Sequence, residues 1–227
     1  MAKPADMLTE LANALAARVE TAKNAVVAVR AREARHLTGL VWQPGIVVVS
    51  EQALPRKDEF ELVAPGGSIL AAQVAGRDPS TNIAILKTAE PLVAPALAAA
   101  DAHVGAVALA IGADGVGGAS ARLGIVNLAG GEWHSRRGGL IERRIVLDIT
   151  LAHCEEGGPV FDAAGACRAC RRSGRAVRSS SFPTRPLRVW CRNSSRTAIS
   201  HAAGSGSHCM PSRSPMRCAR ALTKPAG

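Results

Sequence analysis

The sequence predicts an all-β protein built from two small antiparallel barrels. Between residues 25 and 161 the chain contains many short segments rich in Val, Ile and Leu, separated by turns that hold Gly or Pro. They form two series, one on each side of a Pro- and Ala-rich stretch at residues 90–100. Short strands with frequent turns are typical of barrels and sandwiches, and two series separated by a linker indicate two barrels.

The first element is expected to be an amphipathic helix. Residues 5–23 are rich in Ala and place Met7, Leu8, Leu11, Leu15 and Val19 at helical spacing. Its polar face is not rich in Lys or Arg, so we expect the apolar face to pack against the following domain. Binding to a partner or to a membrane surface remains an alternative.

The strands then follow in two groups. The first group comprises residues 25–31, 36–42, 46–50, 60–64, 69–78 and 83–87, and the second 106–111, 122–128, 142–150 and 159–161. Only 3% of the residues are aromatic and there is no Tyr, so the core must be aliphatic.

The formal net charge of +10 is confined to the C-terminal part of the chain. Residues 167–227 hold 13 of the 28 Lys and Arg residues and none of the 18 acidic residues, so residues 1–166 carry 15 basic and 18 acidic residues, a net of −3. This tail has little aromatic interleaving, which excludes specific nucleic-acid recognition and leaves non-specific binding as an alternative function.

Residues 166–227 also lack the residue pattern of a folded domain. They are rich in Arg, Ser, Cys and Pro and show neither a twofold nor a 3.6-residue period. Such a segment buries too little apolar area to offset its chain entropy, so we expect a disordered tail and an incomplete second barrel. Codons compatible with residues 168–183, read one nucleotide later, can spell GMSAFGPRGQVLVIP, which has the apolar residues of a strand, so the tail is interpreted as the product of a frameshift.

Cysteine usage argues against an exported disulfide protein, because five of the six Cys residues lie in the tail and only Cys154 lies in the body. No signal peptide and no apolar run long enough to span a bilayer are present, so the chain as written is expected in the cytoplasm. Nothing in the sequence specifies an oligomeric state.

Residues 148–162 read DITLAHCEEGGPVFD, and four segments of the chain together resemble the HtrA/DegP branch of the trypsin-like serine proteases. The other segments are TGLVWQPGIVVVSEQAL at 38–54, VAGRDPSTNIAILK at 74–87 and VGAVALAIGADGVGGASARLGIVNLAG at 104–130. The resemblance covers residues 24–165, which implies a protease domain following an N-terminal helix at 1–23. Extended or unfolded peptide is then the expected ligand.

The resemblance places the catalytic His at Gln52, the Asp at Asn82 and the nucleophilic Ser at Glu156. An amide cannot take the proton from a nucleophile, and a carboxylate is a poor nucleophile toward a peptide bond. The oxyanion-hole position, Cys154 to Glu156, has Cys in place of Gly. We therefore expect a catalytically inactive homologue, with an active quality-control endopeptidase as the alternative.

The same loop contains groups that suggest other chemistry. His153, Cys154, Glu155 and Glu156 are consecutive, and consecutive side chains cannot all point to one ion, so no metal site and no cofactor are expected. A Cys154 nucleophile with His153 as its base is disfavoured because neighbouring side chains in an extended loop point apart. Cys167 and Cys170 have zinc or redox spacing but no second pair.

Overall fold

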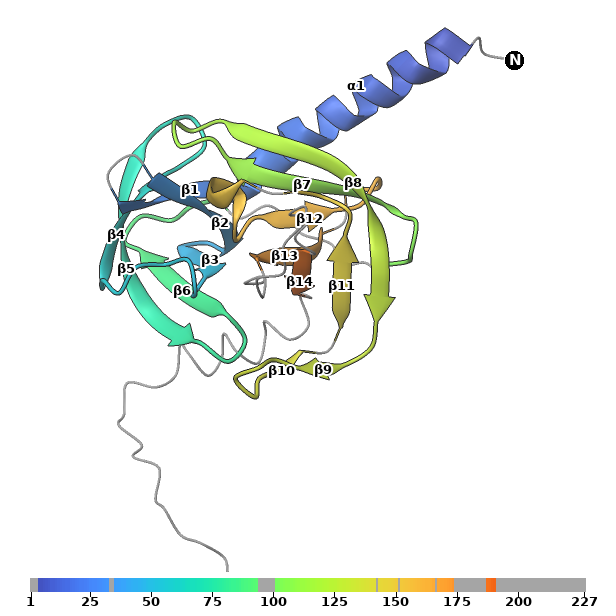
Figure 1. Cartoon of the computed structure of the whole chain (residues 1–227). Coiled ribbons are helices and arrows are strands. Elements are labelled where there is room, and N and C mark those ends of the chain that lie inside the picture. The colour runs from blue at the N-terminus through green and yellow to red at the C-terminus, as the bar shows by residue number, and fades with distance from the viewer. Residues whose placement is uncertain are drawn as a thin grey trace, which may run out of the picture.

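The computed structural model describes residues 4–32, 35–93, 101–141, 143–150, 152–165, 167–173 and 187–190. One helix precedes two β-barrels that lie side by side (Figure 1). The elements are α1 (Pro4–Ala22), η1 (Lys23–Ala25), β1 (Val26–Arg32), β2 (Arg35–Gln43), β3 (Ile46–Ser50), β4 (Glu59–Val63), β5 (Ile69–Asp78), β6 (Ile83–Thr88), β7 (Val107–Ala113), β8 (Ala119–Gly130), β9 (Trp133–His134), β10 (Leu140–Ile141), β11 (Arg144–Leu147), η2 (His153–Glu155), β12 (Pro159–Phe161), β13 (Cys167–Ser173) and β14 (Leu187–Trp190).

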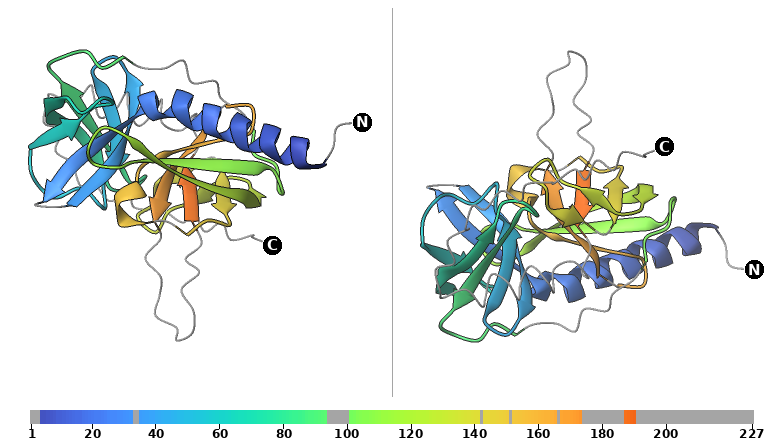
Figure 2. Two further views of the ribbon diagram at one scale, coloured as in Figure 1. Left: turned by 90° about the horizontal axis from the view of Figure 1, so that it is seen from above. Right: turned by 90° about the horizontal axis from the view of Figure 1, so that it is seen from below.

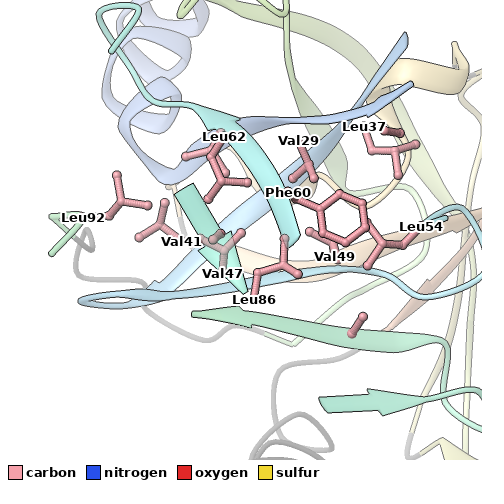
Figure 3. Packing of buried hydrophobic residues seen from close by; sticks show 14 of the residues in the cluster. Val29, Leu37, Val41, Val47, Val49, Leu54, Phe60, Leu62, Leu86 and Leu92 are labelled. Atoms are coloured by element: carbon pink, nitrogen blue, oxygen red, sulfur yellow. The ribbon is translucent and has the colours of Figure 1, made fainter. Parts of the chain in front are cut away.

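The first barrel is closed by six antiparallel strands in the order β1-β2-β3-β6-β5-β4. The ring closes where β1 meets β4, through the pairs Ala28↔Val63 and Val29↔Leu62. Its interior is aliphatic apart from Phe60, and Figure 3 shows Val49, Leu54 and Phe60 gathered inside it. Each fully buried Leu, Ile or Val contributes about 1.5–3 kcal/mol, so this core is the main source of the barrel's stability.

The second barrel begins with the long hairpin of β7 and β8. On the other sides of this hairpin, β8 pairs with β11 and β7 pairs with β12. Small or branched side chains such as Ala108, Ala110 and Val160 fill the interior. β13 pairs with β12, and β14 joins β13 to β11, so the strands follow one another in a ring.

The last two strands come from the segment that was expected to be disordered and to leave the second barrel incomplete. In the described part of this segment, β13 pairs with the edge of β12 and β14 with the edge of β11. A β-ladder is made by main-chain groups, so the free edge of β12 pairs with a neighbour that has no apolar alternation. The other tail residues, 174–186 and 191–227, lie outside the described residues.

Two apolar contacts hold the barrels together. In the first, Ala22 and Val26 pack with Leu109, Ile111 and Phe161 of the second barrel. In the second, the β9–β10 hairpin places Trp133 and Ile141 against the outside of β3 and β6, next to Val48, Ile83 and Ile85. The barrels are therefore fixed relative to each other on two sides of the molecule.

The predicted double barrel with its N-terminal helix is confirmed. β9, β10 and η2 are too short to show a period and were not predicted. The expectation that α1 packs on the domain holds only for its C-terminal end, because residues 6–14 are exposed. Figure 2 shows the N-terminal end of α1 extending beyond the barrels. No helix among the described residues is long and apolar enough to span a bilayer.

Candidate functional site

Gln52 lies in the turn that follows β3, at the face where the two barrels meet. The Leu54 N–H donates to the Ser50 carbonyl at 3.1 Å and closes this turn. The Gln52 side chain is exposed and has no hydrogen bond to another described residue. Its backbone N–H, however, donates to Asn82 Oδ1 at 2.7 Å, so Gln52 meets Asn82 through the main chain.

Asn82 is positioned by the turn between β5 and β6. Asp78 accepts hydrogen bonds from the Ser80 N–H at 2.9 Å, from Ser80 Oγ at 2.6 Å and from Thr81 Oγ1 at 2.5 Å. Burial opposes ionisation of Asp78, but these donors hold the pKa of its carboxyl below the ordinary value. Asn82 then takes a φ of 65°, which Asn tolerates better than most residues, and its side chain is buried.

Glu156 follows η2, in a loop that is pressed against β2. The Thr38 N–H donates to the Glu156 carbonyl at 3.1 Å, and the Thr38 hydroxyl donates to the Cys154 carbonyl at 2.8 Å. The same hydroxyl accepts the Ala113 N–H at 2.9 Å, so Thr38 joins β2, β7 and this loop. Gly157 has a φ of 92°, and a Cβ there would lie 2.3 Å from the Thr38 carbonyl oxygen, so only glycine fits.

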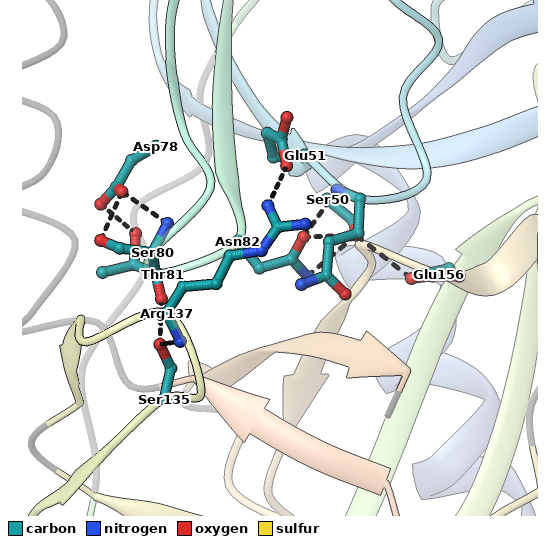
Figure 4. A network of polar contacts seen from close by, with 10 residues as sticks. Ser50, Glu51, Asp78, Ser80, Thr81, Asn82, Ser135, Arg137 and Glu156 are labelled. Atoms are coloured by element: carbon teal, nitrogen blue, oxygen red, sulfur yellow. Dashed lines mark hydrogen bonds and ion pairs between the residues drawn. The ribbon is translucent and has the colours of Figure 1, made fainter. Parts of the chain in front are cut away.

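Ser50 connects the positions of Asn82 and Glu156 through one buried hydroxyl (Figure 4). Asn82 Nδ2 donates to Ser50 Oγ at 3.0 Å, and Ser50 Oγ lies 3.2 Å from Glu156 Oε1. The amide orientation of Asn82 follows from the Gln52 N–H that its Oδ1 accepts. Ser50 has one proton to donate, and we assign it to the Glu156 carboxylate, which is the stronger acceptor.

The backbone amides of this loop are engaged within the loop itself. The Glu155 N–H donates to the Ala152 carbonyl at 3.1 Å, and the Glu156 N–H donates to the His153 carbonyl at 3.2 Å. An oxyanion hole needs N–H groups that point toward the oxygen of a substrate. The Glu156 N–H points back into its own turn, so it is not available for that role in this conformation.

The β9–β10 hairpin of the second barrel reaches over to the turn that carries Asn82. The Ser135 hydroxyl donates to the Ser80 carbonyl at 2.5 Å and accepts the Gly139 N–H at 3.2 Å. Arg137, from the same hairpin, lies 4.0 Å from the Glu51 carboxylate, and Figure 4 shows its side chain running past Asn82. The hairpin thus borders the site on this side.

A sequence profile described as the trypsin-like peptidase domain matches residues 37–169. The chain belongs to the trypsin-like peptidase family. Its fold resembles the crystal structure of Mycobacterium tuberculosis Rv3671c, a Ser-to-Ala mutant in an inactive form, with a TM-score of 0.67, 20% identity, and coverage of 85% of this chain and 93% of that one. It also resembles the serine endoprotease from Yersinia pestis, with a TM-score of 0.66, 19% identity, and coverage of 85% and 67%. No curated protein sequence matches the chain.

Within this trypsin-like peptidase domain, the three positions assigned from sequence lie together at the barrel interface. Asn82 contacts the Gln52 main chain directly and Glu156 through Ser50. Neither Gln52 nor Ala53 carries a group that can take up a proton. The neighbour on the other side, Glu51, has a carboxylate that lies 4.0 Å from Arg137. The assembled groups form a hydrogen-bond chain that runs from the Gln52 main chain through Asn82 and Ser50 to Glu156.

Glu155 is committed to a structural role. Its buried carboxylate accepts hydrogen bonds from Arg122 Nε at 2.5 Å, the Ala152 N–H at 2.8 Å and Ser120 Oγ at 3.1 Å. Burial alone would raise the pKa of Glu155, but these three donors stabilise the charged form and hold its pKa below the ordinary value of 4.5. Glu155 therefore anchors the loop to β8.

Two hydroxyl residues that organise the site were not predicted from the sequence. Ser50 and Thr38 gave no signal because they look like ordinary polar positions at the end or in the middle of a strand. Their importance comes from contacts with residues 106 and 116 positions away in the chain. His153 lies 3.5 Å from Glu156 and its side chain is exposed, and no group of metal-ligating residues is found in the described part of the chain.

Proposed function

We propose that the chain is a proteolytically silent homologue of the HtrA-type serine proteases. The observation that carries this proposal is the state of Glu156, which stands at the nucleophile position. Its carboxylate is buried and hydrogen-bonded to Ser50, and its backbone N–H is bonded to the His153 carbonyl. The position therefore lacks the hydroxyl nucleophile of a serine protease and one of the amides that an oxyanion hole requires.

The other two matched positions support the same conclusion. General-base catalysis needs a group with a pKa near the working pH, and the amide of Gln52 has none. The Asp of a triad also stabilises an imidazolium, whereas Asn82 is neutral and uses its amide oxygen for the Gln52 N–H. Gln52 lacks the proton-transfer capacity of His, Asn82 lacks the charge of Asp, and Glu156 has a carboxylate in place of the Ser hydroxyl, while the hydrogen-bonded framework remains in place.

The test is proteolysis by the purified full chain. We expect no cleavage of unfolded casein above a control without enzyme, and no labelling by a serine-directed fluorophosphonate probe. An active trypsin-like protease treated in parallel verifies both assays. Labelling mapped to a residue in 24–165 would refute the proposal and support the active endopeptidase that is the alternative.

We further propose that the sequence beyond residue 166 arose from a shifted reading frame. The proposal is supported by the abrupt loss of acidic residues and the excess of Cys and Arg in this segment. The nucleotide sequence of the gene decides it, since early stop codons in the shifted frame would rule it out. Weak DNA binding that falls steeply with salt would then be an incidental property of the basic tail.

A further inference from the structure

Helix α1 carries an apolar stripe of which only one end is covered. Ala22 is buried and Val19 is partly buried in the cluster formed with β7 and β12. On the same face, toward the N-terminus, Leu11 is 56% exposed, Leu8 69% and Met7 59%. We call Met7, Leu8 and Leu11 the α1 stripe. It continues a surface that already packs against a barrel, but it contacts little of its own chain.

A second uncovered apolar surface lies on the outside of the second barrel. Val107 pairs with Ile125 across β7 and β8, and Leu123 lies two residues before Ile125 on the same face. Val126 lines the interior of the barrel, and in a regular strand Leu128, two residues later, would face the same way. The register of β8 with β11 shifts between these two residues, and this bulge turns Leu128 to the outer face. These four residues, the β7–β8 patch, are 38–56% exposed.

Part of the outer face of β7 is already covered within the chain, and that contact indicates which kind of element fits the exposed part. Leu109 and Ile111 belong to the outer face of β7, as Val107 does, and they are buried against Ala22 and the segment that follows α1. In this chain, therefore, the outer face of β7 is already matched to apolar residues at the end of α1. The β7–β8 patch extends that face, and the α1 stripe extends that helix.

The chain's own helix cannot bring the two surfaces together. α1 is a single helix of 19 residues, about 28 Å long, and its first half extends away from the barrels (Figures 1 and 2). An anionic membrane is a poor match, because the charged residues in the first half of the described helix, Asp6 and Glu10, are both acidic. An isolated helical segment of this length is also marginally stable in water, so a packing partner would stabilise it.

We propose that the partner is a second copy of this chain. In a twofold pair, the α1 stripe of each copy covers the β7–β8 patch of the other, so the same helix–sheet contact forms twice. A single helix–sheet contact is small against the roughly 1,200–2,000 Å² of a stable interface, whereas two symmetric contacts come closer to it. The proposal does not depend on whether the chain is proteolytically active.

The test is the mass of the full chain in solution, measured by sedimentation equilibrium between about 1 and 100 µM, the range in which micromolar dimers dissociate. We expect a monomer–dimer equilibrium. Leu11→Glu or Ile125→Glu places an unpaired charge in the interface and should weaken the dimer by at least about tenfold. Asn13→Glu lies on the exposed opposite face of α1, about 120° or more around the helix from Met7, Leu8 and Leu11, so it is the matched control and should leave the dimer unchanged.

Mixing the two variants distinguishes this arrangement from other dimers. A pair made of one Leu11→Glu chain and one Ile125→Glu chain keeps one intact contact, so it should associate more tightly than either variant alone. The proposal is overturned if the chain stays monomeric or if neither substitution weakens the dimer. It is also overturned if the mixed variants associate no more tightly than each variant alone. Binding of a monomeric chain to phosphatidylglycerol vesicles would instead assign the stripe to a membrane surface. Unchanged thermal unfolding verifies that the variants fold.

Discussion

Among single residues, Ser50 is expected to affect stability because two buried groups depend on its hydroxyl. Ser50→Ala removes the acceptor of Asn82 Nδ2 and the donor to Glu156, and leaves both buried groups without this partner. An unsatisfied buried polar group costs about 1–3 kcal/mol, so we expect a loss of that size in the free energy of unfolding, measured by urea denaturation.

Ser68→Ala is the control for this measurement. Ser68 is exposed in the turn before β5, and such surface changes usually alter stability by less than about 0.5 kcal/mol. Equal stability of the two variants would mean that the Ser50 hydroxyl does not connect Asn82 and Glu156 in solution.

A second prediction concerns Glu155 and the pH dependence of the free energy of unfolding. Its pKa is lowered in the folded state, so its stabilising contribution is fully present above the unfolded value near 4.5 and is lost as the pH falls through the folded value. Glu155→Gln should lower stability at neutral pH and flatten the decline below about pH 4.5. Thermal unfolding between pH 7 and pH 3 measures both effects.

The comparison for Glu155 is Glu61→Gln. Glu61 pairs with Arg30 on the surface, where an ion pair contributes about 0–1 kcal/mol. If both variants show the same acid dependence, the contacts of Glu155 with Arg122 and Ala152 do not contribute to acid stability. Asp78 also has a lowered pKa, so part of the acid dependence should remain in both variants.

Among the elements, the β9–β10 hairpin decides how the barrels are joined at the site. Gly139 faces the Asn82 turn, and a Cβ there would lie 2.5 Å from the Ser80 carbonyl oxygen. Gly139→Ala should therefore push the hairpin away from the first barrel and destabilise the protein by about 1–3 kcal/mol, as overpacking does. Faster limited proteolysis within residues 131–141 should accompany the loss.

Gly131→Ala is the matched control, because a Cβ at this position would have no other atom within 4 Å. It lies in the same segment and should change neither stability nor cleavage rate. If the Gly139 variant behaves in the same way, the hairpin does not dock on the Ser80 turn.

At the scale of the whole molecule, restoring the triad should not restore activity. Gln52→His, Asn82→Asp, Glu156→Ser and Cys154→Gly return every matched residue, but the η2 turn still directs the residue-156 N–H to the His153 carbonyl. Loss of one oxyanion-hole donor costs on the order of 100- to 1,000-fold in rate. We expect no casein cleavage above background by the fourfold variant.

Thermal unfolding verifies that the fourfold variant is folded before its activity is measured. Clear casein cleavage by this variant would contradict the prediction, because it would mean that the turn opens readily once the side chains are replaced. Fluorophosphonate labelling without cleavage would indicate that the nucleophile is active but the substrate site is not.

The sequence alone determined the two-barrel architecture and predicted which positions of the chain form the candidate site. Strands such as 46–50 and 69–78 were predicted with their observed bounds, because the repetition of apolar residues and turns is a local property of the chain. The positions of Gln52, Asn82 and Glu156 came from four local motifs in the right order.

Only the tertiary structure decided how those positions are connected. Ser50 reaches Glu156 across 106 residues of sequence, and Thr38 reaches Cys154 across 116, so no local pattern could reveal either contact. β13 likewise has no apolar alternation of its own, yet it pairs with the edge of β12 that would otherwise be unpaired. The partners of backbone groups and of single buried hydroxyls depend on which segments meet in space. Local patterns of residue types do not specify those meetings.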